Sequence, residues 1–383
     1  MKKIRKKLKI LELTNYSVGG CGVWQRVKQE SQELSKKGYI VKVFSSDLEK
    51  GTDKRVCKEE IINTIKVIRF PAKKLGGESF MSWFDKRTQE KALEYAPDII
   101  IAHSYRHPHT LQALKIAGKL RKQGKKCRVF LVTHAPFERS STRTFFHSLI
   151  VLLYDFFIGR FTLKRFDKII TISRWEEDYL YRLGIGQDSI SYVPNGIPES
   201  FFNLKPLSME ENKILFLGRV SPIKNLETVI RAFPLLKDNS ITFDITGPQE
   251  ENYALKLTKL INSLNLNKRI FFSPPIFDLK EKIKKIDSCK LFILPSKSEG
   301  LPQSLIEAMA REKIVITSDN RAGKELLLDK KNGFLFKIGE EKELAEVINK
   351  IKYNNLYSIK KQAKKRVEMF RWKNVINNLT NLF

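Results

Sequence analysis

The chain has 383 residues, more than the roughly 250 to 300 that usually share one hydrophobic core, so a single-domain protein is not expected. Apolar residues make up 42%, an ordinary share for a globular protein, and they are enough to build two cores. The net charge of +29, from 71 basic and 42 acidic side chains, is unusually large and predicts attraction to polyanions.

The positive charge is densest in residues 101–175, which carry +12, compared with +9 for residues 1–100 and +8 for the rest. Nucleic-acid binding would call for an aromatic and basic platform, a zinc module or a helix-turn-helix pattern. The sequence has none of these, so no nucleic-acid partner is expected. An anionic membrane surface or a phosphorylated acceptor would account for the charge. A lysine-rich composition without any such partner is the alternative.

The sequence also bears on the cellular compartment. The four cysteines are far apart and form no Cys-x-x-Cys pair, which indicates a reduced compartment and no structural zinc. The basic start is followed only by the short apolar run Ile10 to Leu13, interrupted by Glu12, so a first strand is expected there and not a signal peptide. The segment 145–158 is too short for the roughly 20 residues of a membrane-spanning helix. We therefore expect a cytoplasmic protein, with the inner face of the cell membrane as a candidate contact.

Short apolar runs alternate with longer mixed segments through the first 200 residues. The runs are Leu8 to Leu13, Ile40 to Phe44, Val67 to Phe70, Ile99 to Ala102, Val129 to Thr133 and Ile169 to Ile172. Continuous runs of this length indicate parallel strands buried on both faces. Helices are expected at 23–37 and 110–123, each followed by a glycine that ends it. The alternation is that of repeated β-α-β units.

The alternation restarts after a polar, proline-bearing stretch at 198–212. Strands are expected at Ile214 to Leu217, Thr242 to Thr246, Ile270 to Phe272, Leu291 to Leu294 and Val315 to Thr317. Intervening helices are expected at 226–236, 253–264 and 304–310. The predicted domains are therefore residues 1–200 and 201–365, followed by a helical end at 366–383.

A glycine-rich loop at 17–22 lies between the first expected strand and the first expected helix. Its glycines, Gly19, Gly20 and Gly22, would let the backbone approach a phosphate or carboxylate at the helix N-terminus. The spacing is not that of the dinucleotide-binding fingerprint, so an ordinary turn between strand and helix is the competing interpretation.

At the same junction of the second half stand Gly218, Arg219 and, five residues after the arginine, Lys224. Two cations beside a helix start suit a diphosphate leaving group whose negative charge grows as the bond to the sugar breaks. Surface charges without a ligand are the alternative.

The most specific motif is the segment 299–307, in which Glu299 and Glu307 are separated by seven residues. Glu299 is expected in a loop after a buried strand, and Glu307 within the following helix, which begins near Ser304. Both carboxylates can then face one ligand, whose hydroxyl groups would donate hydrogen bonds to them. An ordinary loop and helix with surface glutamates is the alternative.

Taken in this order, the motifs resemble family four of the glycosyltransferases, retaining enzymes of the GT-B fold that use nucleotide sugars. The resemblance covers nearly the whole chain and also includes Asp98 with its strand, His134, the segments 170–173 and 193–197. It implies an α/β fold of GT-B architecture, with two Rossmann-like, doubly wound parallel-sheet domains facing across a cleft. It also implies that the C-terminal helix packs back on the N-terminal domain.

The resemblance assigns roles to these residues. Arg219 and Lys224 would hold the donor diphosphate, Glu299 the sugar hydroxyls, and Glu307 the ribose. The donor-binding set would further include Gly19, Gly20, Gly22, Gly218, Gly300, Leu301 and Ser304. His134 would reach toward the donor sugar and the reacting centre, so the predicted catalytic residues are His134, Arg219, Lys224 and Glu299. For His103, a structural role is favoured over a place on the acceptor side.

The sequence departs from the family pattern at several positions. Ala135 and Pro136 follow His134 in place of the usual Asp or Gly, and Asn225 follows Lys224 where Gly is common. Arg311 and Glu312 replace a pair of small residues, and the segment 246–248 lacks a second glycine. None of these changes removes a charged donor contact, so they bear on the acceptor and the sugar more than on the activity.

No Asp-x-Asp metal motif occurs at a suitable place, and Arg219 and Lys224 can supply the positive charge. Transfer without a metal or cofactor is therefore expected, with a UDP- or GDP-sugar as donor. Because no carboxylate stands out as a nucleophile, a front-face retaining route is preferred by inference from the family.

The acceptor is expected to be a glycan or a lipid-linked sugar. In the segment 137–166, apolar residues alternate with Arg139, Arg143, Arg160, Lys164 and Arg165, a composition suited to the membrane interface. A core helix with a basic exposed face is the alternative. Other functions considered are a sugar-nucleotide epimerase, a phosphorylase of the same fold, or a non-catalytic protein that binds polyanions or membranes.

Overall fold

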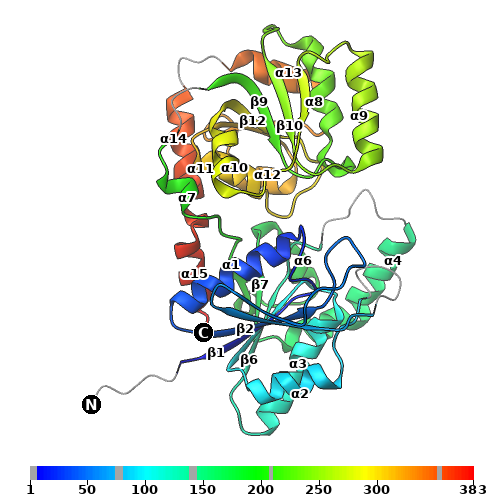
Figure 1. Cartoon of the computed structure of the whole chain (residues 1–383), viewed down its shortest axis with the longest axis vertical. Coiled ribbons are helices and arrows are strands. Elements are labelled where there is room, and N and C mark those ends of the chain that lie inside the picture. The colour runs from blue at the N-terminus through cyan, green and yellow to red at the C-terminus, as the bar shows by residue number, and fades with distance from the viewer. Residues whose placement is uncertain (1–6, 74–80, 138–144, 207–209, 352–355) are drawn as a thin grey trace. The chain divides into compact units, whose positions relative to one another are not determined.

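The computed structural model describes residues 7–73, 81–137, 145–206, 210–351 and 356–383. They form two compact units, drawn with their elements labelled in Figure 1. Unit 1 comprises residues up to 196 together with 372–383, and unit 2 comprises residues 197–371. Each unit has its own hydrophobic core around a sheet.

Unit 1 is built on an eight-stranded sheet in the order β3-β4-β2-β1-β5-β6-β7-β8, parallel except where β3 pairs with β4. Its strands are β1 (Lys9–Leu13), β2 (Ile40–Ser46), β3 (Glu59–Ile62), β4 (Ile65–Phe70), β5 (Ile99–His103), β6 (Arg128–Val132), β7 (Lys168–Thr171) and β8 (Ile190–Tyr192). The central strands are buried on both faces because helices cover the sheet.

The helices of unit 1 include a long apolar stretch after β6. The unit contains α1 (Gly22–Lys36), α2 (Lys86–Tyr95), α3 (Pro108–Lys122), α4 (Phe145–Tyr154), a π-helical turn (Asp155–Gly159), α5 (Arg160–Thr162), α6 (Glu177–Arg182) and α15 (Trp372–Thr380). The last of these, α15, packs against α1. The side chain of Trp372 donates to Gln29, and a Cβ on Gly196 would lie 2.6 Å from the indole ring.

Unit 2 has a six-stranded, wholly parallel sheet in the order β11-β10-β9-β12-β13-β14. Its strands are β9 (Glu211–Leu217), β10 (Thr242–Thr246), β11 (Ile270–Ser273), β12 (Cys289–Leu294), β13 (Ile314–Ser318) and β14 (Phe334–Phe336). Numbered from β9, this is the order 3-2-1-4-5-6 of a doubly wound nucleotide-binding sheet.

The helices of unit 2 lie on both faces of its sheet (Figure 1). They are α7 (Ser200–Asn203), α8 (Leu226–Ala232), α9 (Glu251–Ser263), α10 (Leu279–Asp287), α11 (Gln303–Ala310), α12 (Arg321–Leu326), α13 (Glu341–Lys350) and α14 (Leu356–Val367). In the figure, α8, α9 and α13 cover one face, and α10, α11 and α12 the other.

The unit boundaries differ from the predicted domain boundaries by a few residues. The chain passes between the units at 196/197 and 371/372, where 200/201 and 365/366 were predicted. Residues 197–200 belong with unit 2 because Ile197 donates its N–H to the Phe370 carbonyl and pairs with Arg371 in a short bridge. Phe201 and Phe370 then lie in the same core.

Three of the described strands, β3, β8 and β14, were not predicted from the sequence. Each has three or four residues and lies at the edge of its sheet, where only one neighbour exists. An edge strand needs less apolar surface than a central one, so β3 and β8 lack the continuous apolar run that revealed the others, whereas in β14 the apolar run Phe334–Phe336 was overlooked.

Candidate active site

In unit 2, the loops that follow β9 and β12 carry the charged motifs. The two strands are neighbours in the sheet, and the chain leaves them toward opposite faces. Ligands of doubly wound sheets bind at the carboxyl ends of such a strand pair, where the strand order reverses. Arg219 and Lys224 follow β9, and Glu299 follows β12. The fold therefore brings the Arg219–Lys224 motif and the Glu299–Glu307 motif to the carboxyl ends of the same sheet.

Lys224 and Glu299 are in direct contact. Lys224 ends a short 3-10 turn, and its Nζ lies 2.6 Å from Oε1 of Glu299. The hydroxyl of Ser296 donates to the same oxygen over 2.6 Å. The lysine and glutamate side chains are 18% and 13% exposed, so the pair is shielded but accessible.

Asn225, directly after Lys224, has a φ of 53°, in the left-handed region. Asparagine tolerates this conformation better than other residues with a side chain, which explains how it can replace the glycine usual in the family. The turn that presents Lys224 is therefore kept.

Glu307 also has a cationic partner. It is buried on α11, and Nζ of Lys282 on α10 lies 2.7 Å from its Oε1 and 2.6 Å from its Oε2. Ser304 lies half-buried in the first turn of α11, and Gly300 and Leu301 lie half-buried in the preceding loop. A carboxylate has room for several donors, so Glu307 can still accept hydrogen bonds from hydroxyl groups.

Arg219 stands apart from the other predicted residues. Its side chain is 68% exposed, and its ion-pair partner is Glu250 at 3.8 Å, a distance at which a surface pair contributes little. The backbone of Gly218 is tightly packed against that of Gly247, because a Cβ on Gly247 would lie 2.0 Å from the Gly218 carbonyl oxygen. The tight packing of these two glycines keeps the end of β9 close to the end of β10.

In unit 1, a cavity of about 190 Å³ lies at the equivalent place, where the order reverses between β1 and β5. It is lined by residues of the loops after β1, β2, β5 and β6, among them Asn15, Lys50, His107 and His134. Drug-sized ligands usually occupy roughly 300 to 1,000 Å³, so this cavity suits a smaller, sugar-sized group.

The glycine-rich loop forms one wall of this cavity through Cys21, and α1 begins at Gly22. Gly19 has a φ of 86°, and a Cβ there would lie 3.1 Å from the Lys50 amide nitrogen, so this position requires glycine. Gly20 and Gly22 are exposed with open space around them. Only Gly19 among the three is required by local backbone geometry.

His134 follows β6 and lines the cavity, with a backbone φ of 60°, and the next residue, Ala135, has a φ of 53°. The buried carboxylate of Glu176 holds this unusual turn. Its Oε2 accepts from the Thr133 hydroxyl at 2.5 Å and from the Ala135 N–H at 2.8 Å, and its Oε1 accepts from two further backbone amides. Burial raises the pKa of Glu176 to about 7.

Behind His134, polar side chains form a buried chain. His134 Nε2 lies 2.9 Å from His103 Nδ1, and His103 Nε2 lies 2.7 Å from Glu12 Oε2. His103 is fully buried and is not among the residues that line the cavity, so it has the structural position favoured by the sequence. Burial lowers the pKa of His103 to about 3 and that of His134 well below its usual value.

The buried chain ends in an ion pair on α1. Arg26 Nε lies 2.9 Å from Glu30 Oε2, and Arg26 also donates to Asn195 and to the Val193 carbonyl. Glu12 and Glu30 are fully buried, and burial raises the pKa of both carboxyls, that of Glu12 to about 8.

Four residues near the site were not predicted from the sequence, namely Glu12, Arg26, Glu30 and Glu176. Two signals were available. Glu12 interrupts the apolar run of a central strand, where an acidic residue is costly unless it has partners. Ser173 and Glu176 have the spacing of a capping box, and the structure contains one there.

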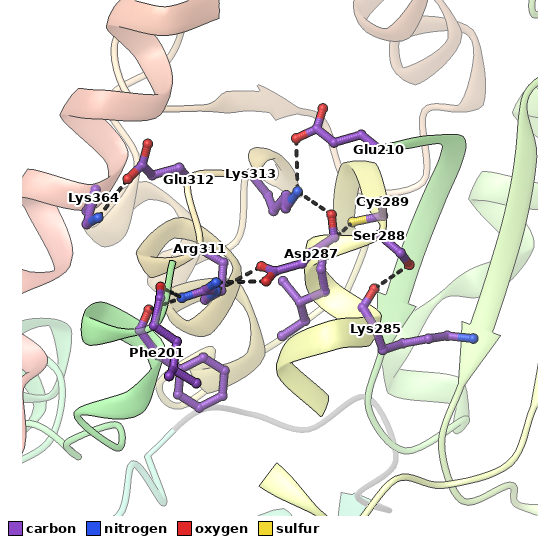
Figure 2. A network of polar contacts seen from close by, with 12 residues as sticks. Phe201, Glu210, Lys285, Asp287, Ser288, Cys289, Arg311, Glu312, Lys313 and Lys364 are labelled. Atoms are coloured by element: carbon purple, nitrogen blue, oxygen red, sulfur yellow. Dashed lines mark hydrogen bonds and ion pairs between the residues drawn. The ribbon is translucent and has the colours of Figure 1, made fainter. Parts of the chain in front are cut away.

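The pair Arg311 and Glu312, unusual for the family, belongs to a structural network shown in Figure 2. The buried Arg311 guanidinium binds Asp287 through two hydrogen bonds of 2.8 and 2.7 Å and also donates to the Phe201 carbonyl. Lys313 binds Glu210 at 2.9 Å. Asp287 precedes β12 and Lys313 precedes β13. The network therefore lies at the amino-terminal ends of the strands, whereas the candidate site lies at their carboxyl ends.

Within the described ranges, one group of side chains has the spacing of metal ligands, namely Glu12, Glu30 and His103. This group lies in the core of unit 1, and the Arg26 guanidinium already supplies a positive charge beside it. It is therefore distinct from the residues predicted to bind the diphosphate.

Two family models match the chain. The model described as glycosyl transferases group 1 matches residues 199–368, and the model described as glycosyltransferase family 4 matches residues 20–201. Between them they cover both units.

Curated relatives match parts of the chain. An uncharacterized glycosyltransferase of Methanocaldococcus jannaschii is 28% identical over 252 residues, which are 62% of this chain and 63% of the relative. The poly(ribitol-phosphate) alpha-N-acetylglucosaminyltransferase of Staphylococcus aureus is 26% identical, over 46% of this chain and 36% of the relative. An N,N'-diacetylbacillosaminyl-diphospho-undecaprenol alpha-1,3-N-acetylgalactosaminyltransferase of Campylobacter jejuni is 27% identical, over 41% of this chain and 40% of the relative. Each match spans less than two thirds of the relative's length.

Solved structures match nearly the full length. Sucrose-phosphate synthase from Thermosynechococcus elongatus matches with a TM-score of 0.74 at 18% identity, with 98% of both chains covered. HepE of Anabaena, in complex with UDP and glucose, matches with a TM-score of 0.71 at 18% identity and the same coverage. At this identity the likeness shows the fold.

The two doubly wound sheets, the order of the motifs and the two family models agree. The chain belongs to the group 1, family 4 glycosyltransferases and has the GT-B fold.

Proposed function

We propose that the protein is a retaining glycosyltransferase that moves a hexose or related sugar from a UDP- or GDP-sugar to a hydroxyl group of a glycan or lipid-linked acceptor in cell-surface glycan synthesis. The observation that carries the proposal is the Lys224–Glu299 pair at the reversal point of the unit 2 sheet. The named relatives that act on poly(ribitol-phosphate) and on a diphospho-undecaprenol sugar support the acceptor class.

The pair suits a nucleotide sugar because it offers opposite charges to opposite parts of the donor. The Lys224 ammonium would bind the diphosphate, whose negative charge grows as the glycosidic bond breaks. The Glu299 carboxylate, released from Lys224, would accept from the sugar hydroxyls. Arg219 is exposed and held only weakly by Glu250, so it is free to turn toward the diphosphate, and Glu307 would accept from the ribose.

Donor binding is tested by thermal unfolding with UDP-, GDP-, ADP- and CMP-sugars. A UDP- or GDP-sugar is expected to raise the unfolding temperature, because a ligand that binds only the folded state stabilises it. The shift should vanish in Lys224→Met and persist in Lys284→Met, whose lysine pairs with Glu281 on the exposed face of α10. Equal shifts in both variants would contradict the assignment.

The stereochemistry and the metal requirement need separate measurements. Transfer with retention is expected, and nuclear magnetic resonance of the anomeric proton in the first product reads it out. Turnover should survive an excess of chelator, because Lys224 and Arg219 supply the charge that a divalent cation would otherwise supply. Loss of turnover in chelator would refute metal independence. Release of an epimerised or free sugar without acceptor would favour the epimerase alternative.

We further propose that unit 1 contacts an anionic membrane surface. Eight large apolar side chains are exposed between 149 and 161, whereas the other exposed ones are scattered along the chain. They are Leu149, Ile150, Leu152, Leu153, Phe156, Phe157, Ile158 and Phe161, here called the apolar helix surface. Such a concentration on α4 and the following turns marks an interaction site.

The charges beside the apolar helix surface favour anionic lipid as the partner. Arg160, Lys164 and Arg165 are exposed there. The nearby Asp155 is neutralised by Arg106, whose Nη2 lies 2.6 Å from its Oδ2. An amphipathic helix with apolar and basic faces lies in the membrane interface, and each basic residue near an anionic surface adds about 1 kcal/mol. No helix within the described ranges is long and apolar enough to cross a bilayer.

Vesicle sedimentation tests this proposal. Binding to phosphatidylcholine vesicles should rise steeply when phosphatidylglycerol is added, and the double variant F156S/F157S should lose it. The control is Phe277→Ser, which removes a phenylalanine of unit 2 that is 89% exposed. Equal binding to both vesicle types, or self-association without lipid, would count against the membrane.

A further inference from the structure

The hydrogen-bonded chain behind the unit 1 cavity connects a surface group to a buried charge. His134 lines the cavity, His103 lies behind it, and Glu12 lies behind His103. His103 and Glu12 stand on the neighbouring strands β5 and β1, which fixes their separation. No solvent reaches His103 or Glu12, so each of their hydrogen bonds has to be made within the protein.

The buried end of this chain holds one proton. Two carboxyls, Glu12 and Glu30, share their surroundings with one guanidinium, that of Arg26, and two ionised carboxylates would leave one negative charge uncompensated in the core. Among the described residues, neither Oε1 of Glu12 nor Oε1 of Glu30 has a partner. One oxygen of Glu12, one oxygen of Glu30 and a ring nitrogen of His103 all lie within 4.8 Å of one another. A proton held between the two carboxyl groups would give their unpartnered oxygens a hydrogen bond and bring the cluster to neutrality.

The position of that proton determines the tautomers of both histidines. With Glu12 Oε1 engaged in sharing it, Oε2 is an acceptor, so His103 Nε2 carries the hydrogen. A neutral imidazole has only one N–H, so His103 Nδ1 is an acceptor. His134 Nε2 must then carry the hydrogen, and His134 Nδ1 is left with its lone pair. Burial keeps both rings neutral.

We propose that Glu12 and His103 are positioning residues for sugar transfer, and that they hold His134 in the tautomer whose Nδ1 accepts a hydrogen bond from a hydroxyl group in the unit 1 cavity. The inference rests on the proposed function for the identity of that hydroxyl, which belongs to the donor sugar or to the acceptor. Glu176 fixes the backbone of the same residue through Thr133 and Ala135, so His134 is held at both ends.

The tautomer is measured on the free protein, without any substrate. Nitrogen-15 spectra of labelled histidine distinguish a ring nitrogen that bears hydrogen from one that does not. The chain has five histidines, and replacing each one in turn assigns its signals, because those signals disappear from the spectrum of that variant. His134 Nδ1 is expected to lack hydrogen, and a protonated Nδ1 would overturn the proposal whatever the enzyme does. This measurement can therefore refute the proposed tautomer without bearing on whether the protein is a glycosyltransferase.

Two variants at position 12 separate the hydrogen bond from the packing. In Glu12→Gln, the amide nitrogen donates to Glu30 and the amide oxygen accepts from His103, so the tautomers and the turnover number should stay close to wild type. In Glu12→Leu, the acceptor for His103 is gone while Arg26 and Glu30 still balance each other. We expect its turnover number to fall on the order of 10-fold or more, with a changed His134 spectrum.

The kinetics of Glu12→Leu also identify the hydroxyl. If it belongs to the donor sugar, donor hydrolysis without acceptor falls by the same factor as transfer. If it belongs to the acceptor, transfer alone falls. A folded Glu12→Leu protein whose turnover number, both KM values and His134 spectrum match the wild type would overturn the proposal.

Discussion

The two units hold their charges in different ways. In unit 2, Lys224 and Glu299 are paired but partly exposed at the end of the sheet, and each can exchange its partner for a ligand. In unit 1, Glu12, Arg26 and Glu30 are sealed in the core and are connected to the cavity through the two histidines. Partly exposed pairs contribute little to stability and are available for binding, whereas buried pairs are costly to break and act by fixing geometry.

This contrast predicts the largest stability effect at Arg26. Arg26→Met leaves the Glu30 carboxylate without its guanidinium partner in the core, so we expect a loss of about 3–5 kcal/mol in the free energy of unfolding. Urea unfolding measures it. The matched control is Lys36→Met on the same helix, whose pair with Glu33 is exposed and should cost no more than about 1 kcal/mol. Similar losses in the free energy of unfolding of both variants would contradict the distinction between buried and exposed ion pairs.

In unit 2, removing one member of the partly exposed pair should lower the activity more than the stability. Lys224→Met is expected to lower the turnover number about 100-fold, as for the loss of one preorganised donor to a developing negative charge, while stability changes by about 1 kcal/mol or less. Steady-state kinetics and urea unfolding check the two parts. Turnover within threefold of wild type would refute the role of Lys224.

The buried carboxyls predict a stability that falls at mildly alkaline pH. Glu12 keeps its proton in the folded state up to a pKa of about 8 but releases it near 4.5 when unfolded, so stability decreases as pH rises between these values. His103, whose pKa is lowered to about 3, has the opposite effect between 3 and 6.5. From pH 6.5 to 8 the carboxyl effect is unopposed by His103, and the loss is up to about 2 kcal/mol.

Urea unfolding at pH 6.5, 7.5 and 8.5 measures this slope, and Glu12→Gln should reduce it. The ionisable groups beside Glu12 and its two partners His103 and Glu30 are Arg26, His109 and His134. Burial lowers the pKa of His109 to about 3 and that of His134 well below its usual value, so neither histidine accounts for the predicted window. A slope unchanged in Glu12→Gln would place its origin elsewhere.

The smallest effect concerns the turn that presents His134. Ala135 is in the left-handed region, where a residue with a Cβ costs about 1–2 kcal/mol. Glycine removes that strain but loses more chain entropy on folding, so Ala135→Gly should stabilise the protein by at most about 1 kcal/mol. A loss of stability would show that the Ala135 methyl group contributes packing that offsets the strain.

Much of the fold was predictable because central parallel strands have a strong local signal. The apolar runs at 99–102 and 291–294 correspond to β5 and β12, since both faces of these strands are covered. The edge strands β3 and β8 were missed because they bury less surface. Of the helical end predicted at 366–383, the last residues of α14 lie in unit 2, and α15 lies in unit 1.

The sequence by itself determined the class of protein and the positions of Arg219, Lys224, Glu299 and Glu307, because strand ends and motif spacing are local properties of the chain. Only the tertiary structure decided which charges meet. It pairs Lys224 with Glu299 across 75 residues and places Glu12 next to His103 across 91. Such partners are set by the order of strands in a sheet, which brings distant segments to one edge, and no local pattern in the sequence records that order.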